Sequence, residues 1–319
     1  MGLRRNAQTN RRSEGLMSTT DRATGALVGM ACGDALGAGY EFGPALPDDR
    51  VVRMKGGGGF MWEPGEWTDD TSMAIPLAQA LARGDRLDDA ETLDRVVSEW
   101  ATWADTAPDV GNQTRAVLGQ LQDATEASAR VAARAEHERY GQSGGNGSLM
   151  RTAPVALGHL SDPEGLVATA RRVSDLTHFD EDAGDACVIW CLAIRRAIVD
   201  GELDVRSGID ALPSDRRQRW HDLLDVAEAS QPRDFTSNGW VVEAVQGAWS
   251  AITHGTTLVD MLERAVRGGN DTDTVAAIAG GLAGAFYGAS AVPPEWREIV
   301  HGWPGLRFGD LVELAEAAI

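Results

Sequence analysis

Apolar positions along this 319-residue chain recur almost everywhere at the three-to-four spacing of an α-helix. Alternation typical of a β-strand is nearly absent, and residues 50–54 are the best candidate for a strand. The pattern therefore predicts a single all-α domain over residues 21–319. Its helices are expected at residues 23–38, 71–83, 87–103, 149–160, 164–176, 181–199, 241–252, 257–266 and 272–287.

The two ends of this pattern differ from its centre. Residues 1–20 are polar, rich in arginine and without the apolar core of a secretory signal, so we expect a disordered tail there. Met17 is a candidate for the true start, because the patterned sequence begins just after it. Residues 201–237 are polar and weakly patterned, and we interpret them as an excursion on the surface.

Two of the predicted helices repeat glycine at close spacing. The repeats are Gly25, Gly29, Gly33 and Gly37 in the first and Gly280, Gly281, Gly284 and Gly288 in the last. A glycine inside a helix costs about 1 kcal/mol relative to alanine. Their repetition therefore indicates that another helix, or the backbone around a ligand, comes very close.

Charge and cysteine usage exclude several classes of function. The formal net charge is −19, which argues against a general nucleic-acid partner and against an anionic membrane surface. An anionic substrate would need local help from metals, helix N-termini or a few arginines. The three cysteines suit a reducing cytoplasm, and Cys187 and Cys191, four apart, are interpreted as buried packing residues. No stretch has the length and polarity of a membrane span.

Two acidic motifs open apolar helical runs far apart in the sequence. They are Thr68-Asp69-Asp70-Thr71 and Asp271-Thr272-Asp273-Thr274, and glycines precede both. Carboxylates and hydroxyls are hard oxygen ligands that suit Mg²⁺ or Mn²⁺ better than zinc. The alternative is that both motifs are ordinary helix caps. A cap needs one oxygen rather than three, so the doubled pattern favours a shared metal site.

A glycine-rich segment over residues 141–148 precedes another predicted helix. Exposed backbone N–H groups in such a segment form a plausible cradle for a diphosphate, which would let an acidic protein hold an anion. The alternative is a merely flexible loop. Residues 56–59 are also rich in glycine but lack the ending of a P-loop, so they predict no phosphate site of that kind.

Six motifs, taken together and in this order, resemble the ADP-ribosylglycohydrolase family, over roughly residues 22–300. They are the glycine-rich helix from Gly25 to Gly37, Trp67 to Thr71, Asp109 to Arg115, Asn146 to Arg151, Thr177-His178, and Gly268 to Thr274. One departure is Asn270, which stands before Asp271 where the family pattern runs directly from glycine to aspartate. The ligand types are intact, so the difference looks tolerable.

The resemblance implies a compact orthogonal helical bundle with two Mg²⁺ or Mn²⁺ ions in a central cleft. The implied ligands are Thr68, Asp69, Asp70, Asp271, Asp273 and Thr274. Glu41 and Asp109 match the catalytic candidates. The residues expected to bind substrate are Gly111, Ser143, Gly144, Gly145, Asn146, Gly147 and His178. Each of the single residues has a plainer interpretation: a surface acid for Glu41, a turn or cap for Asp109, and packing for His178.

The implied reaction is hydrolysis of the bond between the anomeric carbon of the distal ribose of ADP-ribose and an acceptor nitrogen or oxygen. The expected partner is an ADP-ribosylated protein or a small ADP-ribosyl compound, and the product is ADP-ribose. Two alternatives stay open: a dimetal phosphohydrolase acting on nucleotides, and a non-catalytic relative that binds ADP-ribose. Because all six ligand positions are present, the non-catalytic alternative is disfavoured.

Overall fold

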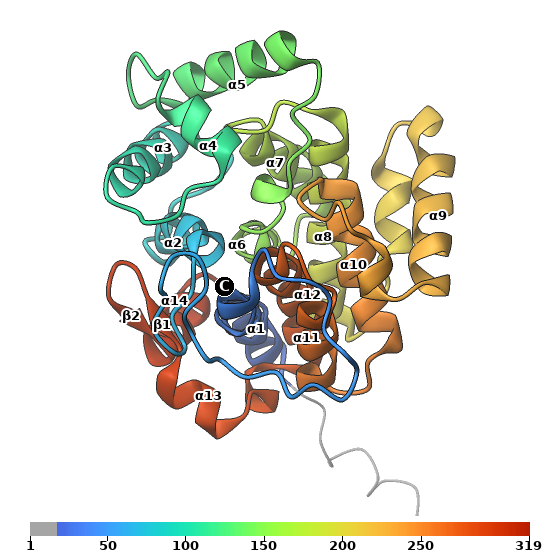
Figure 1. Ribbon diagram of the computed structural model, residues 1–319. Coiled ribbons are helices and arrows are strands. Elements are labelled where there is room, and N and C mark those ends of the chain that lie inside the picture. Colours follow the sequence, from blue (N-terminus) through green and yellow to red (C-terminus); the bar gives the residue numbers. More distant parts are fainter. Residues whose placement is uncertain (1–17) are drawn as a thin grey trace, which may run out of the picture.

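Helices account for nearly all of the regular structure in the computed structural model, which describes residues 18–319 (Figure 1). The α-helices are α1 (Thr19–Gly37), α2 (Asp69–Ala82), α3 (Ala90–Ala104), α4 (Asn112–Leu118), α5 (Glu126–Tyr140), α6 (Ala153–Leu157), α7 (Pro163–Ser174), α8 (Glu181–Asp200), α9 (Ser214–Ala229), α10 (Val241–His254), α11 (Leu258–Arg267), α12 (Thr272–Tyr287), α13 (Pro294–Ile299) and α14 (Phe308–Ala317). Two-residue strands β1 (His301–Gly302) and β2 (Leu306–Arg307) pair antiparallel. The predicted all-α fold is confirmed.

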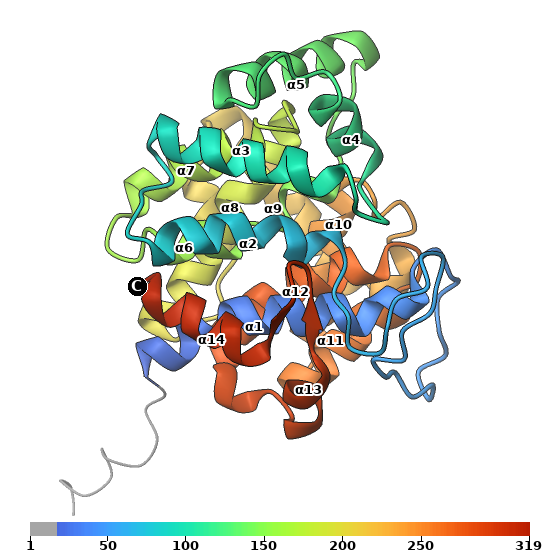
Figure 2. The ribbon, with the colours of Figure 1, turned by 90° about the vertical axis from the view of Figure 1, so that its left-hand side faces the viewer.

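Helices α1 and α12 lie side by side at the centre of the molecule (Figures 1 and 2). The glycine repeats explain how close they come. A Cβ on Gly25 would stand 2.2 Å from the carbonyl oxygen of Gly284, and one on Gly33 would stand 2.0 Å from that of Ala276. Real Cβ atoms essentially never approach so closely, so these positions require glycine. The predicted close helix contact is confirmed.

The close pairing of α1 with α12 also brings polar residues of the two helices together. Near its C-terminal end α1 carries the fully buried Asp34, and Gly37 sits against the backbone of Asp273 at the start of α12. Helix α2 begins beside them at Asp69. Three helix segments that are remote in sequence thus converge on one point.

Four features differ from the expectations. Residues 50–54 form no strand: Val52 and Met54 are buried and their neighbours exposed, but the Arg50 carbonyl accepts hydrogen bonds from the Arg267 side chain instead of a strand. Residues 201–237 contain α9, whose few buried side chains explain its weak pattern. Helices α4, α5, α13 and α14 were not predicted. The expected tail lies outside the described residues up to residue 17, whereas Ser18 caps α1 and residues 19 and 20 begin it.

No helix among residues 18–319 is long and apolar enough to cross a membrane. All three cysteines are buried and free, which agrees with the packing role expected for Cys187 and Cys191.

Candidate active site

Five carboxylates converge where α1, α2 and α12 meet. Asp34, Asp70 and Asp273 each offer one oxygen, and these oxygens lie within 4.8 Å of one another. Glu41, Asp271 and Asp273 form a second group by the same measure. Asp273 belongs to both groups, so the two acidic motifs of the sequence do build one site.

Asp34 holds the start of α2 in place. Its Oδ1 accepts a hydrogen bond of 2.8 Å from the backbone N–H of Thr68. Its Oδ2 accepts from the backbone N–H of Thr71 at 2.9 Å and from the Thr71 hydroxyl at 2.6 Å. The side chain of Asp34 thereby does for α2 what an N-cap residue does, although it comes from another helix. Asp69 and Asp70 are left free to face the site.

The alternative that the acidic motifs are ordinary caps is not supported. Thr68 and Asp271 occupy the N-cap positions of α2 and α12, and neither makes a side-chain capping bond. The Thr68 hydroxyl donates instead to Oδ2 of Asp70 at 2.9 Å. The oxygens of the two motifs therefore face a shared space instead of capping their own helices.

The oxygens of the site are suited to hold cations. Asp70 Oδ1, Asp271 Oδ1 and Glu41 Oε2 are buried without any hydrogen-bond partner. Within residues 18–319, no arginine, lysine or histidine nitrogen lies within 4.0 Å of a carboxylate of either group. Unpartnered buried anions are strongly unfavourable in a folded protein. An oxygen-only donor set of this kind fits Mg²⁺ or Mn²⁺.

The pKa values of these carboxyls are raised because their negative charges are buried close together. Burial, together with the nearby carboxylates of Asp109 and Asp271, raises the pKa of Glu41 to about 9. Burial likewise raises the pKa of Asp69 to about 7 and that of Asp34 to about 6. Asp273 is shifted well above its ordinary pKa by burial and then by Glu41. Bound cations would reverse these shifts, because positive charge favours the ionised form.

A cleft of about 510 Å³ opens above the carboxylates. It is lined by most of the residues singled out in the sequence: Glu41, Asp69, Asp109, Gly111, Gly145, Asn146, Gly147, His178, Asp271 and Thr274. Asp69 Oδ2 accepts a hydrogen bond of 3.2 Å from the Gly111 N–H, which joins the α2 motif to the segment that precedes α4. Asp109 lies on this same wall of the cleft and outside both carboxylate groups.

His178 lines the cleft, and its Nδ1 lies beside a buried hydroxyl group. Arg151, fully buried, donates to the Thr177 hydroxyl at 2.8 Å, and that hydroxyl lies 2.7 Å from His178 Nδ1. His178 Nδ1 is the one acceptor that the structure records for the Thr177 hydroxyl within residues 18–319, so we assign the imidazole hydrogen to Nε2. Burial lowers the pKa of His178 to about 3, so the ring stays neutral. His178 therefore offers a neutral N–H donor beside Gly145 and Gly147.

The glycine-rich segment is a fixed loop. Ser143 donates its backbone N–H to Asp180 at 3.3 Å, and Gly144 accepts from the Val241 N–H at 2.9 Å. Within the described part of the chain, the backbone N–H groups of Gly144 and Gly145 make no hydrogen bond. They remain available for an anion, as a diphosphate cradle requires. The alternative of a merely flexible loop is disfavoured.

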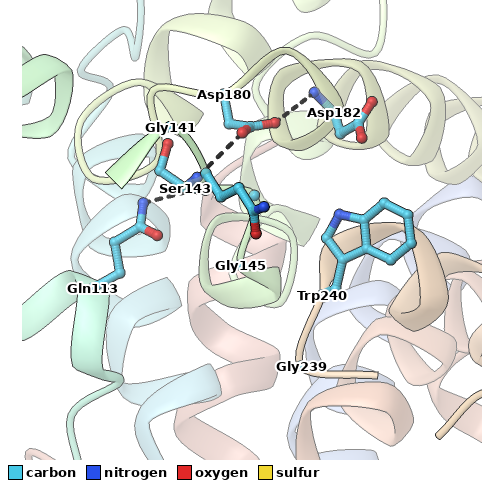
Figure 3. A pocket seen from close by; sticks show the side chains of 10 residues that line it. Gln113, Gly141, Ser143, Gly145, Asp180, Asp182, Gly239 and Trp240 are labelled. Atoms are coloured by element: carbon cyan, nitrogen blue, oxygen red, sulfur yellow. Dashed lines mark hydrogen bonds between the residues drawn. The ribbon is translucent and has the colours of Figure 1, made fainter. Parts of the chain in front are cut away.

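A second cavity of about 670 Å³ continues from the cleft past this loop (Figure 3). The two share Gln113, Gly145 and Gly239 as lining residues, and Ser143 and Gly144 line the second one. Figure 3 shows the indole of Trp240 on one side of the loop, with Asp180 above it. Trp240 is 41% exposed and lines this cavity, so its side chain can contact a ligand there.

Sequence reasoning missed several residues that build the site. Asp34 had a signal, since it is an acid inside an apolar, glycine-rich helix. Asn238 had none: its Oδ1 accepts from the Asp271 N–H at 3.1 Å, and its backbone oxygen accepts from Asn146 at 2.9 Å. Glu41, expected to be catalytic, has its carboxylate among the potential ligands, and Asp69, an expected ligand, lies outside both groups.

Asn270 lies in the loop directly before Asp271, at a backbone position that favours glycine. Its φ is 59°, in the left-handed region, which asparagine tolerates better than most residues. Its N–H donates to the Gly43 carbonyl at 2.8 Å and its carbonyl accepts from the Phe42 N–H at 2.7 Å. These two hydrogen bonds tie the segment that carries Glu41 to the loop that carries Asp271.

Comparisons with known proteins identify the family of this chain. A family model described as ADP-ribosylglycohydrolase matches residues 16–319. The ADP-ribosylarginine hydrolase Tri1 of Pseudomonas putida (strain GB-1) is 34% identical over 291 residues, covering 88% of this chain and 74% of that protein. The ADP-ribosyl-dinitrogen reductase glycohydrolase of Rhodospirillum rubrum is 32% identical over 285 residues, covering 88% and 90%. A solved ADP-ribosylglycohydrolase-related protein complex has a TM-score of 0.75 and 28% identity, covering 95% and 98%. The chain belongs to the ADP-ribosylglycohydrolase family.

Proposed function

We propose that this protein hydrolyses the glycosidic bond between the distal ribose of ADP-ribose and a protein arginine, with two Mg²⁺ or Mn²⁺ ions at the carboxylate site. The observation that carries the proposal is the pair of carboxylate groups sharing Asp273 at the floor of a cleft. The arginine acceptor is supported by the named activity of the relative that is 34% identical.

The shape of the two cavities supports one orientation of the substrate. The diphosphate lies on the free N–H groups of Gly144 and Gly145, and the adenine stacks on Trp240 in the second cavity. The distal ribose then lies over the carboxylates, with the Nε2–H of His178 directed to its oxygens. The acceptor leaves the cleft on the remaining side, past Glu41 and Phe42.

The chemistry is divided among the chain's own residues. Asp70, Asp271, Asp273, Glu41 and the Thr68 and Thr274 hydroxyls would hold the ions. When bound, the two cations supply Lewis-acid polarisation of the sugar hydroxyls and of water. Asp109 lines the cleft but lies outside both carboxylate groups, so its carboxylate stays free to accept the proton of the attacking water.

The acidic cleft also suits a cationic acceptor. Asp69 and Asp109 line the cleft outside both carboxylate groups, and their charge complements a guanidinium group. A serine acceptor would gain nothing from it. A cytoplasmic location, which rests on the unpaired cysteines, stays a prediction.

The test is hydrolysis of peptides carrying ADP-ribose on arginine or on serine, with Mg²⁺, with Mn²⁺ and with EDTA. Release of free ADP-ribose from the arginine peptide, abolished by EDTA, is the expected result. Release of phosphate or AMP instead would favour the nucleotide phosphohydrolase. Thermal stabilisation by ADP-ribose without any turnover would favour the non-catalytic relative.

A further inference from the structure

A cavity lined by basic residues lies beside the catalytic cleft of this acidic protein. It measures about 600 Å³, and its charged lining residues are Arg50, Arg53, Lys55 and Asp49. The three cations are exposed, and no carboxylate of residues 18–319 lies within 4.0 Å of their side-chain nitrogens. Three positive charges against one negative charge in a single cavity stand out on a chain of net charge −19.

The backbone that carries these cations is held in place. Val52 and Met54 are buried, so the side chains of the alternate residues Arg53 and Lys55 face outward. The Arg50 carbonyl accepts two hydrogen bonds of 3.1 Å from the Arg267 guanidinium, on α11. The cations are therefore presented by a preorganised segment, which lowers the entropic cost of binding a partner.

Tyr40 connects the cavity to the cleft. Its hydroxyl accepts a hydrogen bond of 3.0 Å from the Arg53 N–H, and the Lys55 ammonium lies 3.9 Å from its ring centroid. The next two residues along the chain, Glu41 and Phe42, line the catalytic cleft. The cleft and the cationic cavity are thus lined by consecutive residues. A peptide that leaves the cleft past Phe42 therefore reaches the cationic cavity within a few of its own residues.

Apolar side chains of the same segment accompany the cations, and Phe42 and Phe60 among them line the cleft. Phe42 is 70% exposed and Met61 is 81% exposed, and both have a positive φ, of 60° and 62°. The Phe42 and Phe60 rings contact edge to face with centroids 6.4 Å apart. All belong to the segment 41–66, which projects at one edge of the molecule in Figure 2. Exposed aromatic and Met side chains beside arginines are typical of a protein-binding surface.

We propose that this cationic cavity docks an acidic segment of the ADP-ribosylated acceptor protein, next to the modified arginine. The proposal rests on the proposed function, because it concerns the acceptor of that reaction. Glutamates or aspartates near the arginine would pair with Arg50 and Arg53 while the ADP-ribosyl group fills the cleft. The cavity thereby selects among proteins that carry the same modification.

The experiment compares two peptides with ADP-ribose on a single arginine, one flanked by glutamates and one by serines, at low and at physiological salt. The enzyme variants are Arg50→Glu/Arg53→Glu and the control Arg83→Glu/Arg86→Glu, which makes the same change in net charge. Arg83 and Arg86 lie beyond the end of α2 opposite to Asp69, about 20 Å along the helix. In parallel, fluorescence anisotropy measures binding of the unmodified acidic peptide.

The wild type and the control are expected to prefer the acidic peptide on the order of tenfold in kcat/KM at low salt, mainly through KM. The Arg50→Glu/Arg53→Glu variant should lose that preference and keep its rate on the serine peptide. Equal use of both peptides by the wild type, or a preference equally reduced in the control, would overturn the proposal. So would binding of phosphatidylserine vesicles through Arg50 and Arg53 without any preference for the acidic peptide.

Failure of the proposed function gives a different result. If the wild type hydrolyses neither peptide, the arginine reaction is wrong, and the anisotropy decides the docking proposal alone. Binding of the acidic peptide that is lost in Arg50→Glu/Arg53→Glu and kept in the control would still uphold the cavity. No binding by the wild type would overturn it.

Discussion

Gly33→Ala tests whether the glycine contact between α1 and α12 assembles the site. The new Cβ would stand 2.0 Å from the Ala276 carbonyl oxygen, a backbone atom that no side-chain rotation can move. The helices must separate by about 1 Å. Overpacking of a core costs about 1–3 kcal/mol, and the rigid contact puts this site at the upper end. Alanine returns up to about 1 kcal/mol of helix propensity, which leaves a loss of about 2 kcal/mol.

The assay is thermal unfolding followed by circular dichroism, with Mg²⁺ affinity from calorimetry. With an unfolding entropy of about 2.1 cal/mol/K per residue over about 300 residues, the loss corresponds to a Tm lower by about 3 °C. Mg²⁺ affinity should fall as well, because Asp34 follows Gly33 directly and Asp273 lies one turn from Ala276. The control is Gly309→Ala, an exposed position of α14 with nothing within 4 Å of the new Cβ, where Tm should stay or rise slightly. A Gly33→Ala protein as stable as the wild type would refute the reasoning.

Four further predictions concern the carboxylates and the loop. Asp273→Asn should lower turnover by about two orders of magnitude or more and weaken Mg²⁺ binding without unfolding, as calorimetry and circular dichroism would show; full activity of this variant would contradict the assignment of Asp273 as a ligand. Asp109→Ala should lower kcat by about 10²–10⁴-fold and leave the Kd of ADP-ribose nearly unchanged, whereas an equal loss of both would mean a binding role. Gly147→Ala places a Cβ 2.9 Å from the imidazole of His178 and should raise the Kd of ADP-ribose while the metal affinity stays the same. In EDTA, Tm should fall as the pH rises from about 6 to 9. The reason is that carboxyls with pKa values raised to between about 6 and 9 bind protons more tightly in the folded protein than in the unfolded chain. Mg²⁺ should flatten this dependence of Tm on pH, and a Tm that rises with pH in EDTA would contradict the prediction.

The sequence predicted those helices and site carboxylates that a pattern within a single segment identifies. The apolar period located the long core helices, and the two acidic motifs located the carboxylates of α2 and α12. Residues whose role depends on a distant partner left no such signal. Asn238 lies in a polar stretch, and only the fold places its Oδ1 on the Asp271 N–H.

The strand expected at residues 50–54 is instructive because the pattern was real. Val52 and Met54 are buried and Arg53 is exposed, as in a half-buried strand. A strand also needs a neighbour with which to exchange hydrogen bonds, and here the Arg267 and Tyr40 side chains provide the bonds instead. Alternation along one segment indicates which of its side chains are buried. The groups that form hydrogen bonds with its backbone come from other parts of the chain, so the alternation does not predict them.

The order of charges along the cleft gives a physical reason for the proposed substrate. Free N–H groups of Gly144 and Gly145 come first, in a cavity that Asp180 and Asp182 also line, then the carboxylates around Asp273, and then the cations Arg50 and Arg53. An ADP-ribosylated arginine in an acidic segment presents the matching sequence of groups: diphosphate, ribose with a guanidinium, and carboxylates. Each region alone binds many ligands weakly. A substrate that engages all three in register gains affinity that a free nucleotide or a free acidic peptide cannot reach, because each of those meets only one of the favourable regions.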